Sequence, residues 1–273
     1  MTLYLTVFHP QFIVIGADKR QDDIYDTEPE RGRFIDNNVT KIVPVTNKVA
    51  VFGYGQAVNR SYMGRFLASQ YLDTAGDEIK GETVSETASK LLTYCRNNGL
   101  DQRNAELGKS YQWIIAGYDK NDSKPKFFRV DIPGDAEELK VRGEYGSINC
   151  PKFQAYGNPD GAAVCSTIFN KQTLAPNLTI LQSQATVNLK DRMFPITGMN
   201  VLEAYTRKVA NSILETIEMA RLYMNEPDVR DGSFTVPLEQ PFSPIGGNPD
   251  VAVITPETMG FRWRIKNGNV ARY

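Results

Sequence analysis

Short apolar runs separated by turn residues dominate the first sixty residues of the chain. The runs are rich in Val, Ile and Phe, and polar or turn-forming residues separate them, which is typical of β-strands. The expected strands cover residues 3–8, 12–17, 39–45 and 48–54. The polar stretch at 21–38 holds Asp, Glu, Arg and Gly, and we expect it to form a long functional loop or insertion.

Two helices are expected after these strands. The first covers about 57–72. The second is clearer, because Thr83 and Glu86 form a possible capping box at its start and Gly99 makes a plausible stop. The apolar positions at helical spacing are Val58, Tyr62, Phe66 and Leu67 in the first helix and Val84, Ala88, Leu91, Leu92 and Cys95 in the second.

The remainder of the chain returns to strands around one long helix, expected over about 198–225. The apolar stripe of this helix recurs at steps of three or four residues and consists of Leu202, Tyr205, Val209, Ile213, Ile217, Ala220 and Met224. The other expected elements are strands at 111–118, 126–131, 152–156, 250–255 and 260–265, a short helix at 160–168 and a Pro-rich passage at 227–249. Segregated runs of strands and helices favour an α+β layered sandwich over a parallel βαβ sheet, within a single domain, 1–273.

Composition argues against several classes of function. The 31 Lys and Arg residues and the 32 Asp and Glu residues leave a formal net charge of −1, so no basic excess exists to bind nucleic acid or a membrane surface. No apolar run approaches the ~18 residues that a membrane span needs. Cys95, Cys150 and Cys165 form no CxxC motif, and an odd number of cysteines suits reduced thiols. We therefore expect a cytoplasmic protein that binds neither nucleic acid nor membrane.

Histidine is scarce, which limits how the chain could catalyse hydrolysis. His9 is the only histidine, and because it stands one residue before Pro10 at an apparent hairpin turn, we expect it to be exposed. A Ser-His or Cys-His catalytic system would have to use this residue. Hydrolysis by this chain must therefore find its base elsewhere.

Thr2 offers such a base if Met1 is removed. An N-terminal threonine carries a nucleophilic hydroxyl and a free α-amine on one residue, which is the minimum equipment of an N-terminal nucleophile (Ntn) hydrolase. A threonine at position 2 is common, so this signal needs support from the rest of the chain.

Four separated segments resemble the proteasome β-subunit family, including its bacterial relatives. Residues 2–20 match the family's opening without a gap: a threonine, two strands, and a turn of two small residues followed by Asp-x-Arg. Residues 41–55 are similar to the active-site lysine and the strand that ends in the oxyanion-hole glycine. Residues 114–134 resemble the family's hairpin, and residues 246–255 resemble its C-terminal Gly-Gly segment and the strand that follows. The four segments occur in the family's order.

The resemblance implies roles for four residues. Thr2 Oγ would be the nucleophile and its own α-amine the base, with Lys41 beside it as a cation that lowers the pKa of the hydroxyl. Asp18 would hold Lys41 charged and oriented, and the Gly53 N–H would face the oxyanion. We therefore expect the Lys41 ammonium to lie within ion-pair reach of both Asp18 and the Thr2 side chain.

The resemblance also implies a fold and an activity. The fold would be a four-layer αββα sandwich, with strand 2–8 central and helix 198–225 on an outer face. The activity would be that of a threonine peptidase or amidohydrolase acting on peptide or protein substrates within a self-compartmentalising homo-oligomer, either a ring or a helical assembly. We expect no cofactor and no metal, and the sequence does not indicate whether an ATPase partner exists.

Other interpretations stay open. Asp18 could be an ordinary turn acid, Lys41 a surface lysine and Gly53 only the mark of a bulge. The chain could also be a catalytically silent proteasome-like scaffold or binding subunit, or an Ntn amidase acting on a small amide.

The chain departs from the family at two places. Asn158 follows Gly157 where the family has a serine. The acid and serine that precede the family's glycine pair are not at their expected positions. The segment 230–233 could be their displaced remnant, or Ser243 could substitute.

Overall fold

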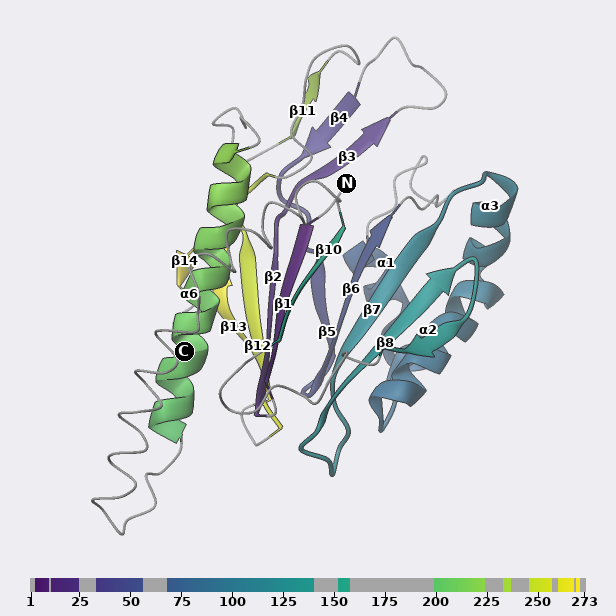
Figure 1. Ribbon diagram of the computed structural model, residues 1–273. Helices are drawn as coiled ribbons and strands as arrows, with labels where there is room; N and C mark the ends of the chain where they lie inside the picture. The colour runs from purple at the N-terminus through teal and green to yellow at the C-terminus, as the bar shows by residue number, and fades with distance from the viewer. Residues whose placement is uncertain are drawn as a thin grey trace, which may run out of the picture.

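Antiparallel strands form the centre of the protein (Figure 1). The computed structural model describes residues 3–9, 11–24, 33–55, 68–139, 152–157, 199–223, 233–236, 246–256, 260–267 and 269–270. Within these ranges the strands form two larger sheets, of six and five strands, and a small sheet of three. Every strand pair in them is antiparallel. The predicted α+β class is therefore confirmed, and a parallel βαβ sheet is excluded for this part of the chain.

The six-stranded sheet contains both N-terminal strands. Its order is β10-β1-β2-β12-β13-β14, so β1 lies inside the sheet between two partners. The strands are β1 (Leu3–His9), β2 (Phe12–Ala17), β10 (Lys152–Gly157), β12 (Asp250–Ile254), β13 (Phe261–Lys266) and β14 (Asn269–Val270). All residues of β1 and β2 are buried, which explains why these strands read as continuous apolar runs rather than as alternating ones.

The five-stranded sheet has the order β5-β6-β7-β8-β9 and is covered by helices. Its strands are β5 (Ile42–Thr46), β6 (Val49–Gly55), β7 (Tyr111–Tyr118), β8 (Pro125–Ile132) and β9 (Ala136–Glu138), and the helices are α1 (Ala68–Ala75), η3 (Gly76–Ile79), α2 (Val84–Asn97) and α3 (Leu100–Glu106). Thr83 caps α2 by accepting a hydrogen bond from Glu86 N at 3.0 Å. Gly99 ends α2 in the left-handed conformation, with φ 70°, so the predicted boundaries of this helix hold.

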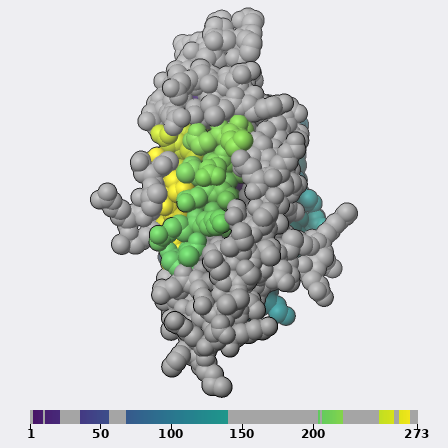
Figure 2. Space-filling view, turned by 60° about the vertical axis from the view of Figure 1, so that its left-hand side comes forward, coloured from purple at the N-terminus to yellow at the C-terminus, as the bar shows by residue number. Residues whose placement is uncertain are grey.

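Three groups of buried apolar side chains join these elements. One lies between helix α6 (Met199–Tyr223) and the six-stranded sheet, one between the two larger sheets, and one between the five-stranded sheet and helices α1–α3. Figure 1 shows α6 and the other helices on opposite sides of the paired sheets, and Figure 2 shows the exposed side of α6 beside the C-terminal strands. The two larger sheets therefore have apolar cover on both faces.

Helix α6 agrees with its prediction where the structure describes its side chains. Val209, Ile213, Ile217 and Ala220 from the predicted stripe are buried against the six-stranded sheet. The side chains of Leu202, Tyr205 and Met224 lie outside the described residues, as do residues 56–67 and the predicted helix at 160–168. Within the described part of the chain, no helix is long and apolar enough to cross a membrane.

Gly16 on β2 allows α6 to lie close to the sheet. A Cβ atom at this position would collide with Cγ2 of Ile213. We expect Gly16→Ala to lower the free energy of unfolding by about 1–3 kcal/mol, because the added methyl overpacks this contact. Urea titration would measure the loss. Combining Gly16→Ala with Ile213→Ala should cost less than the sum of the single changes, whereas additive losses would contradict the contact.

The predicted loop at 21–38 is partly wrong. Its two ends form strands β3 (Gln21–Ile24) and β4 (Arg33–Asp36), which join β11 (Ser233–Val236) in the three-stranded sheet, ordered β11-β4-β3. Strand β11 lies within the passage predicted only as Pro-rich. Strands β3 and β4 carry a weak local signal because they are largely polar. They pair with each other, and β4 also pairs with β11, about 200 residues further along the chain.

His9 is buried, which corrects its predicted exposure. It is the last residue of β1, it is 2% exposed, and its ring stacks on Phe12 at 4.5 Å. The hairpin leaves only residues 10–11 between its strands, so His9 pairs with Phe12 instead of lying in the turn. Its Nδ1 accepts a hydrogen bond from Gln11 N at 3.1 Å. Burial lowers the pKa of His9 to about 4.

This shift predicts a pH dependence of stability. In the unfolded chain His9 has a pKa near 6.5 and binds a proton below that pH, whereas in the folded chain it binds this proton only near pH 4. The contribution of His9 is therefore complete above about pH 6.5 and is lost as the pH falls toward 4, by up to about 3 kcal/mol. Urea unfolding of the protein and of a His9→Asn variant at several pH values would isolate it. Equal slopes for the two proteins between pH 4 and 6.5 would contradict the prediction.

Candidate active site

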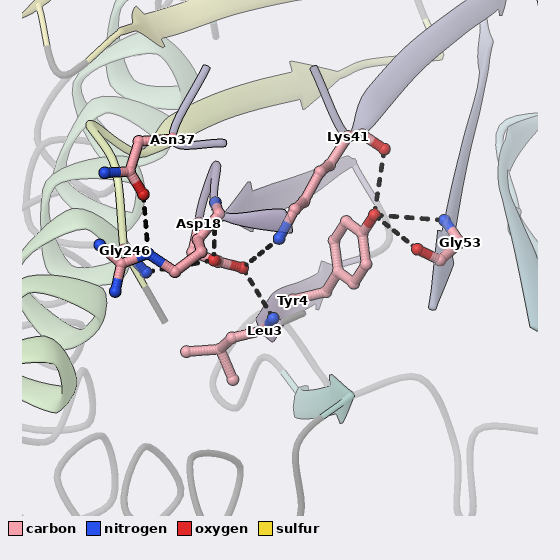
Figure 3. A network of polar contacts seen from close by, with 8 residues as sticks. Leu3, Tyr4, Asp18, Asn37, Lys41, Gly53 and Gly246 are labelled. Carbon is pink, nitrogen blue, oxygen red and sulfur yellow. Dashed lines mark hydrogen bonds and ion pairs between the residues drawn. The ribbon is translucent and has the colours of Figure 1, made fainter. Parts of the chain in front are cut away.

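Asp18 stands immediately after strand β2, fully buried, with hydrogen-bond donors around its carboxylate (Figure 3). Oδ1 accepts from Leu3 N at 2.8 Å and from Lys41 Nζ at 2.8 Å. Oδ2 accepts from Arg20 N at 3.0 Å and from Gly246 N at 3.3 Å. A buried carboxylate is stable only when such donors and a counter-charge replace water. Asp18 is therefore not an ordinary exposed turn residue but a buried carboxylate that joins four segments of the chain.

The counter-charge is Lys41, the residue that precedes strand β5. Its ammonium lies 2.8 Å from Asp18 Oδ1, and the two side chains are 4% and 0% exposed. Lys41 is therefore not a surface lysine. Because both charges are removed from water, losing either one would leave the other buried and uncompensated, at a cost of about 3–5 kcal/mol.

The start of β1 is fastened to the same carboxylate. Leu3 N–H donates to Oδ1, and Asp18 N–H donates back to Leu3 O at 3.2 Å. Leu3 also pairs across the sheet with Gly157 at the end of β10. Thr2 lies outside the described residues, so its side chain is not placed against Lys41. The Leu3 nitrogen that binds Asp18 is, however, the amide nitrogen of the peptide bond between Thr2 and Leu3.

Gly246, the first residue of the predicted glycine pair, contacts the other carboxylate oxygen of Asp18. Lys19 N–H donates to Gly246 O at 2.9 Å, and Gly246 N–H binds Asp18. A Cβ atom on Gly246 would collide with the guanidinium of Arg20, which is fully buried and donates from Nε to Asn37 Oδ1 at 2.7 Å. Glycine at 246 therefore allows the buried arginine to pack against the chain that holds Asp18.

The amide of Gly53, the predicted oxyanion donor, already has a hydrogen-bond partner. Gly53 N–H donates to the hydroxyl of Tyr4 at 3.3 Å, and the same hydroxyl lies 2.8 Å from Gly53 O and 3.2 Å from Lys41 O (Figure 3). A Cβ atom at Gly53 would lie 2.5 Å from Cε1 of Tyr111 and 2.7 Å from Cε3 of Trp113. Packing alone thus requires glycine at this position, whatever its amide does in catalysis.

Gly55 offers the next amide on the same side of β6. Tyr118 N–H donates to Lys48 O, and bonded pairs alternate along an antiparallel ladder, so Gly53 and Gly55 direct their N–H groups away from β7. Gly55 has φ 117°, a conformation that favours glycine. It is the second main-chain donor to consider at this end of the strand.

The structure thus brings two of the four predicted site residues, Asp18 and Lys41, together in an ion pair, and the Tyr4 hydroxyl links Gly53 to the main chain of Lys41. Ser233 of the possible displaced remnant lies in β11, paired with Asp36 of the three-stranded sheet. Asn158, Asp231 and Ser243 are outside the described residues. The sequence gives no sign of the roles of Tyr4 and Asn37, because their contacts with Gly53, Lys41 and Arg20 arise only in the tertiary structure.

Comparison of the chain with known family models and with curated proteins gives no match. The resemblance to proteasome β-subunits therefore stays a prediction, and the site must be argued from its geometry. Within the described ranges, no group of three or more His, Cys, Asp or Glu residues is arranged to hold a metal ion.

Proposed function

We propose that this chain is an N-terminal threonine hydrolase, a peptidase or amidase of the proteasome-like type. The observation that carries the proposal is the shared carboxylate oxygen, Asp18 Oδ1, which holds both the Lys41 ammonium and the main-chain nitrogen of Leu3. A cation and the first described residue of β1 thereby meet at one buried point. Thr2 is bonded directly to Leu3, so the nucleophile would start from this point.

The chemistry follows from these positions. The Thr2 hydroxyl would attack an amide carbonyl while its own α-amine, with an ordinary pKa near 8, takes the proton. Lys41 would stabilise the developing negative charge on the hydroxyl oxygen, and Asp18 would keep the ammonium in place. The oxyanion would bind a main-chain amide of β6. Gly55 is the better candidate, because Gly53 N–H already donates to Tyr4.

The arrangement of the elements supports the finer fold assignment. An Ntn-hydrolase sandwich of the αββα type needs two antiparallel sheets face to face, with a helical layer outside each. The three groups of buried side chains join helix α6, the six-stranded sheet, the five-stranded sheet and helices α1–α3 in that order. We therefore propose this fold for the single domain, together with a cytoplasmic, self-compartmentalising homo-oligomer that cleaves peptides or proteins.

Two alternative functions use the same site differently. A catalytically silent scaffold or binding subunit would keep the Asp18–Lys41 pair for stability alone, and the protein would resist an electrophile. A small-amide Ntn amidase would react with the electrophile but would need no enclosed chamber. Sedimentation separates these possibilities further, because a mass of about one chain at micromolar concentration would exclude the compartment.

Intact mass spectrometry tests the proposal directly. The purified full chain is measured before and after incubation with a peptide β-lactone. When a nucleophilic hydroxyl attacks the lactone carbonyl, the ring C–O bond breaks and the whole inhibitor stays attached as an ester. We expect loss of Met1 and a single adduct on Thr2. A protein that retains Met1, or one that has lost it but gains no mass, would overturn the proposal and favour the scaffold.

A further inference from the structure

Tyr4 crosses from the six-stranded sheet to the five-stranded sheet. It lies on β1, is fully buried, and packs its ring on Phe52 of β6 at a centroid distance of 4.8 Å. Its hydroxyl reaches the gap between Lys41 O and the main chain of Gly53 (Figure 3). One side chain of β1 thus contacts the main chain on both sides of the β5–β6 ladder.

The hydroxyl lies where the next rung of this ladder would be. Strands β5 and β6 pair Val43 with Val51 and Ile42 with Phe52, so Lys41 would face Gly53 next. Bonded pairs alternate, and Val43–Val51 is a bonded pair, which makes Lys41–Gly53 the following one. Instead, Gly53 N–H donates to the Tyr4 hydroxyl at 3.3 Å, and β5 begins only at Ile42.

A hydroxyl can fill this place because it both accepts and donates. It carries one proton, so it accepts from Gly53 N–H and donates either to Gly53 O, at 2.8 Å, or to Lys41 O, at 3.2 Å. Burial raises the pKa of Tyr4 well above its ordinary value of 10. The phenol therefore stays neutral and keeps its proton over the range in which the protein would work.

We propose that Tyr4 is a positioning residue for Lys41. By replacing the ladder bond, its hydroxyl keeps the Lys41 main chain apart from Gly53, and from that position the lysine side chain reaches Asp18. Two neighbouring residues of β1 would then fix both members of the ion pair, since Leu3 N–H holds Asp18 and Tyr4 contacts the Lys41 carbonyl. The catalytic consequence rests on the proposed function of Lys41, whereas the effect on its position does not.

Tyr4→Phe tests the proposal, with Tyr118→Phe as a matched control. Tyr118 is 1% exposed in the same group of side chains between the sheets, and within the described residues its hydroxyl has no hydrogen-bond partner. Without the Tyr4 hydroxyl, Lys41 and Gly53 can pair directly, which draws Lys41 away from Asp18. Acylation of the Lys41 amine by acetic anhydride, measured by peptide mass over a range of pH, reports this change.

We expect Lys41 in Tyr4→Phe to be acylated about tenfold faster, with the pH profile shifted by about one unit to lower pH, because the ammonium has lost its carboxylate. Tyr118→Phe should match the unmodified protein. If the unmodified protein reacts with the lactone, its hydrolysis of a fluorogenic peptide can also be compared. In Tyr4→Phe we expect kcat for this hydrolysis to fall by about 10- to 100-fold with little change in KM. A folded Tyr4→Phe protein with an unchanged Lys41 profile would overturn the proposal.

The outcomes separate the two proposals. If the unmodified protein shows no lactone adduct, the hydrolase proposal fails, while the acylation of Lys41 still decides the role of Tyr4. If Tyr4→Phe does not fold, amide exchange in the unmodified protein decides instead. We expect Gly53 N–H to be as well protected from exchange as Val51 N–H, which lies on the same strand and is bonded to β5. Exchange about 100-fold faster at Gly53 would mean that the hydroxyl does not replace the rung.

Discussion

Replacing Thr2 with alanine is expected to abolish lactone labelling and amide hydrolysis, whereas Thr2→Ser should keep part of both. Alanine removes the attacking oxygen, and nothing else in the proposed mechanism supplies one. Serine keeps the hydroxyl and the α-amine on one residue. An extra residue in front of Thr2 should be as damaging as alanine, because the hydroxyl remains but the amine becomes an amide and can no longer accept a proton.

All three changes leave the described core untouched, so they should not alter stability. Urea unfolding and circular dichroism of each variant would confirm this. Intact mass and the rate of hydrolysis of a fluorogenic peptide then report chemistry alone. Hydrolysis by Thr2→Ala at the original rate would refute the N-terminal nucleophile and require another active site.

The buried strands were predictable because their signal is local. Strands β1 and β2 consist almost wholly of apolar residues and are covered on both faces, so composition and turn residues sufficed to find them. Strands β3 and β4 contain Gln, Asp and Arg; they pair with each other, and β4 also pairs with β11, far along the chain. A local pattern cannot report a partner that distant.

The exposure of His9 was mispredicted for a related reason. Pro10 in the sequence predicts a turn, and the chain does reverse between His9 and Phe12, but the reversal is tighter than the pattern suggested. The pairing of His9 with Phe12, and the stacking of the two rings, extend the strand up to the histidine. Turn chemistry locates the reversal of the chain, whereas the register of the hairpin decides which residues are buried.

At the candidate site, residue types could be proposed from the sequence, but their supports could not. Asp18 and Lys41 stood in recognisable segments, and the structure places them in one ion pair. Tyr4 looked like one more apolar strand residue, and its hydroxyl acts only because β1 lies opposite β6. Gly246 was part of a recognised segment, yet its packing against Arg20 became visible only in three dimensions.

The second large effect is expected from the Asp18–Lys41 pair. Asp18→Asn and Lys41→Met should each lower the free energy of unfolding by about 3–5 kcal/mol, because each leaves a buried charge or a set of buried donors without its partner. Asparagine has one carboxamide oxygen in place of two carboxylate oxygens, so the four donors around Asp18 lose half of their acceptor atoms. Lys41→Ala would add a cavity to this loss, which is why methionine is the cleaner replacement.

The double variant distinguishes a true pair from two independent contributions. Once Asp18 has lost its charge, removing the ammonium relieves an uncompensated cation, so the combined loss should fall short of the sum of the single losses by about 1–3 kcal/mol. Lys90→Met is the matched control, since the Lys90–Glu86 pair has a similar distance, 2.9 Å, but side chains that are 42% and 41% exposed. That change should cost much less than either change in the buried pair, because solvent screens exposed charges. Urea is the suitable denaturant because guanidinium is a salt and screens ion pairs. Strictly additive losses of unfolding free energy would mean that Asp18 and Lys41 do not stabilise one another.

The same variants link stability to chemistry. If Lys41 serves the nucleophile, Lys41→Met must lose lactone labelling under conditions where urea titration shows it folded. Asp18→Asn should lose it as well, because a lysine without its carboxylate no longer has a fixed position beside β1. Folded variants that still react at the original rate would leave the buried pair as a structural element alone and would remove Lys41 from the mechanism.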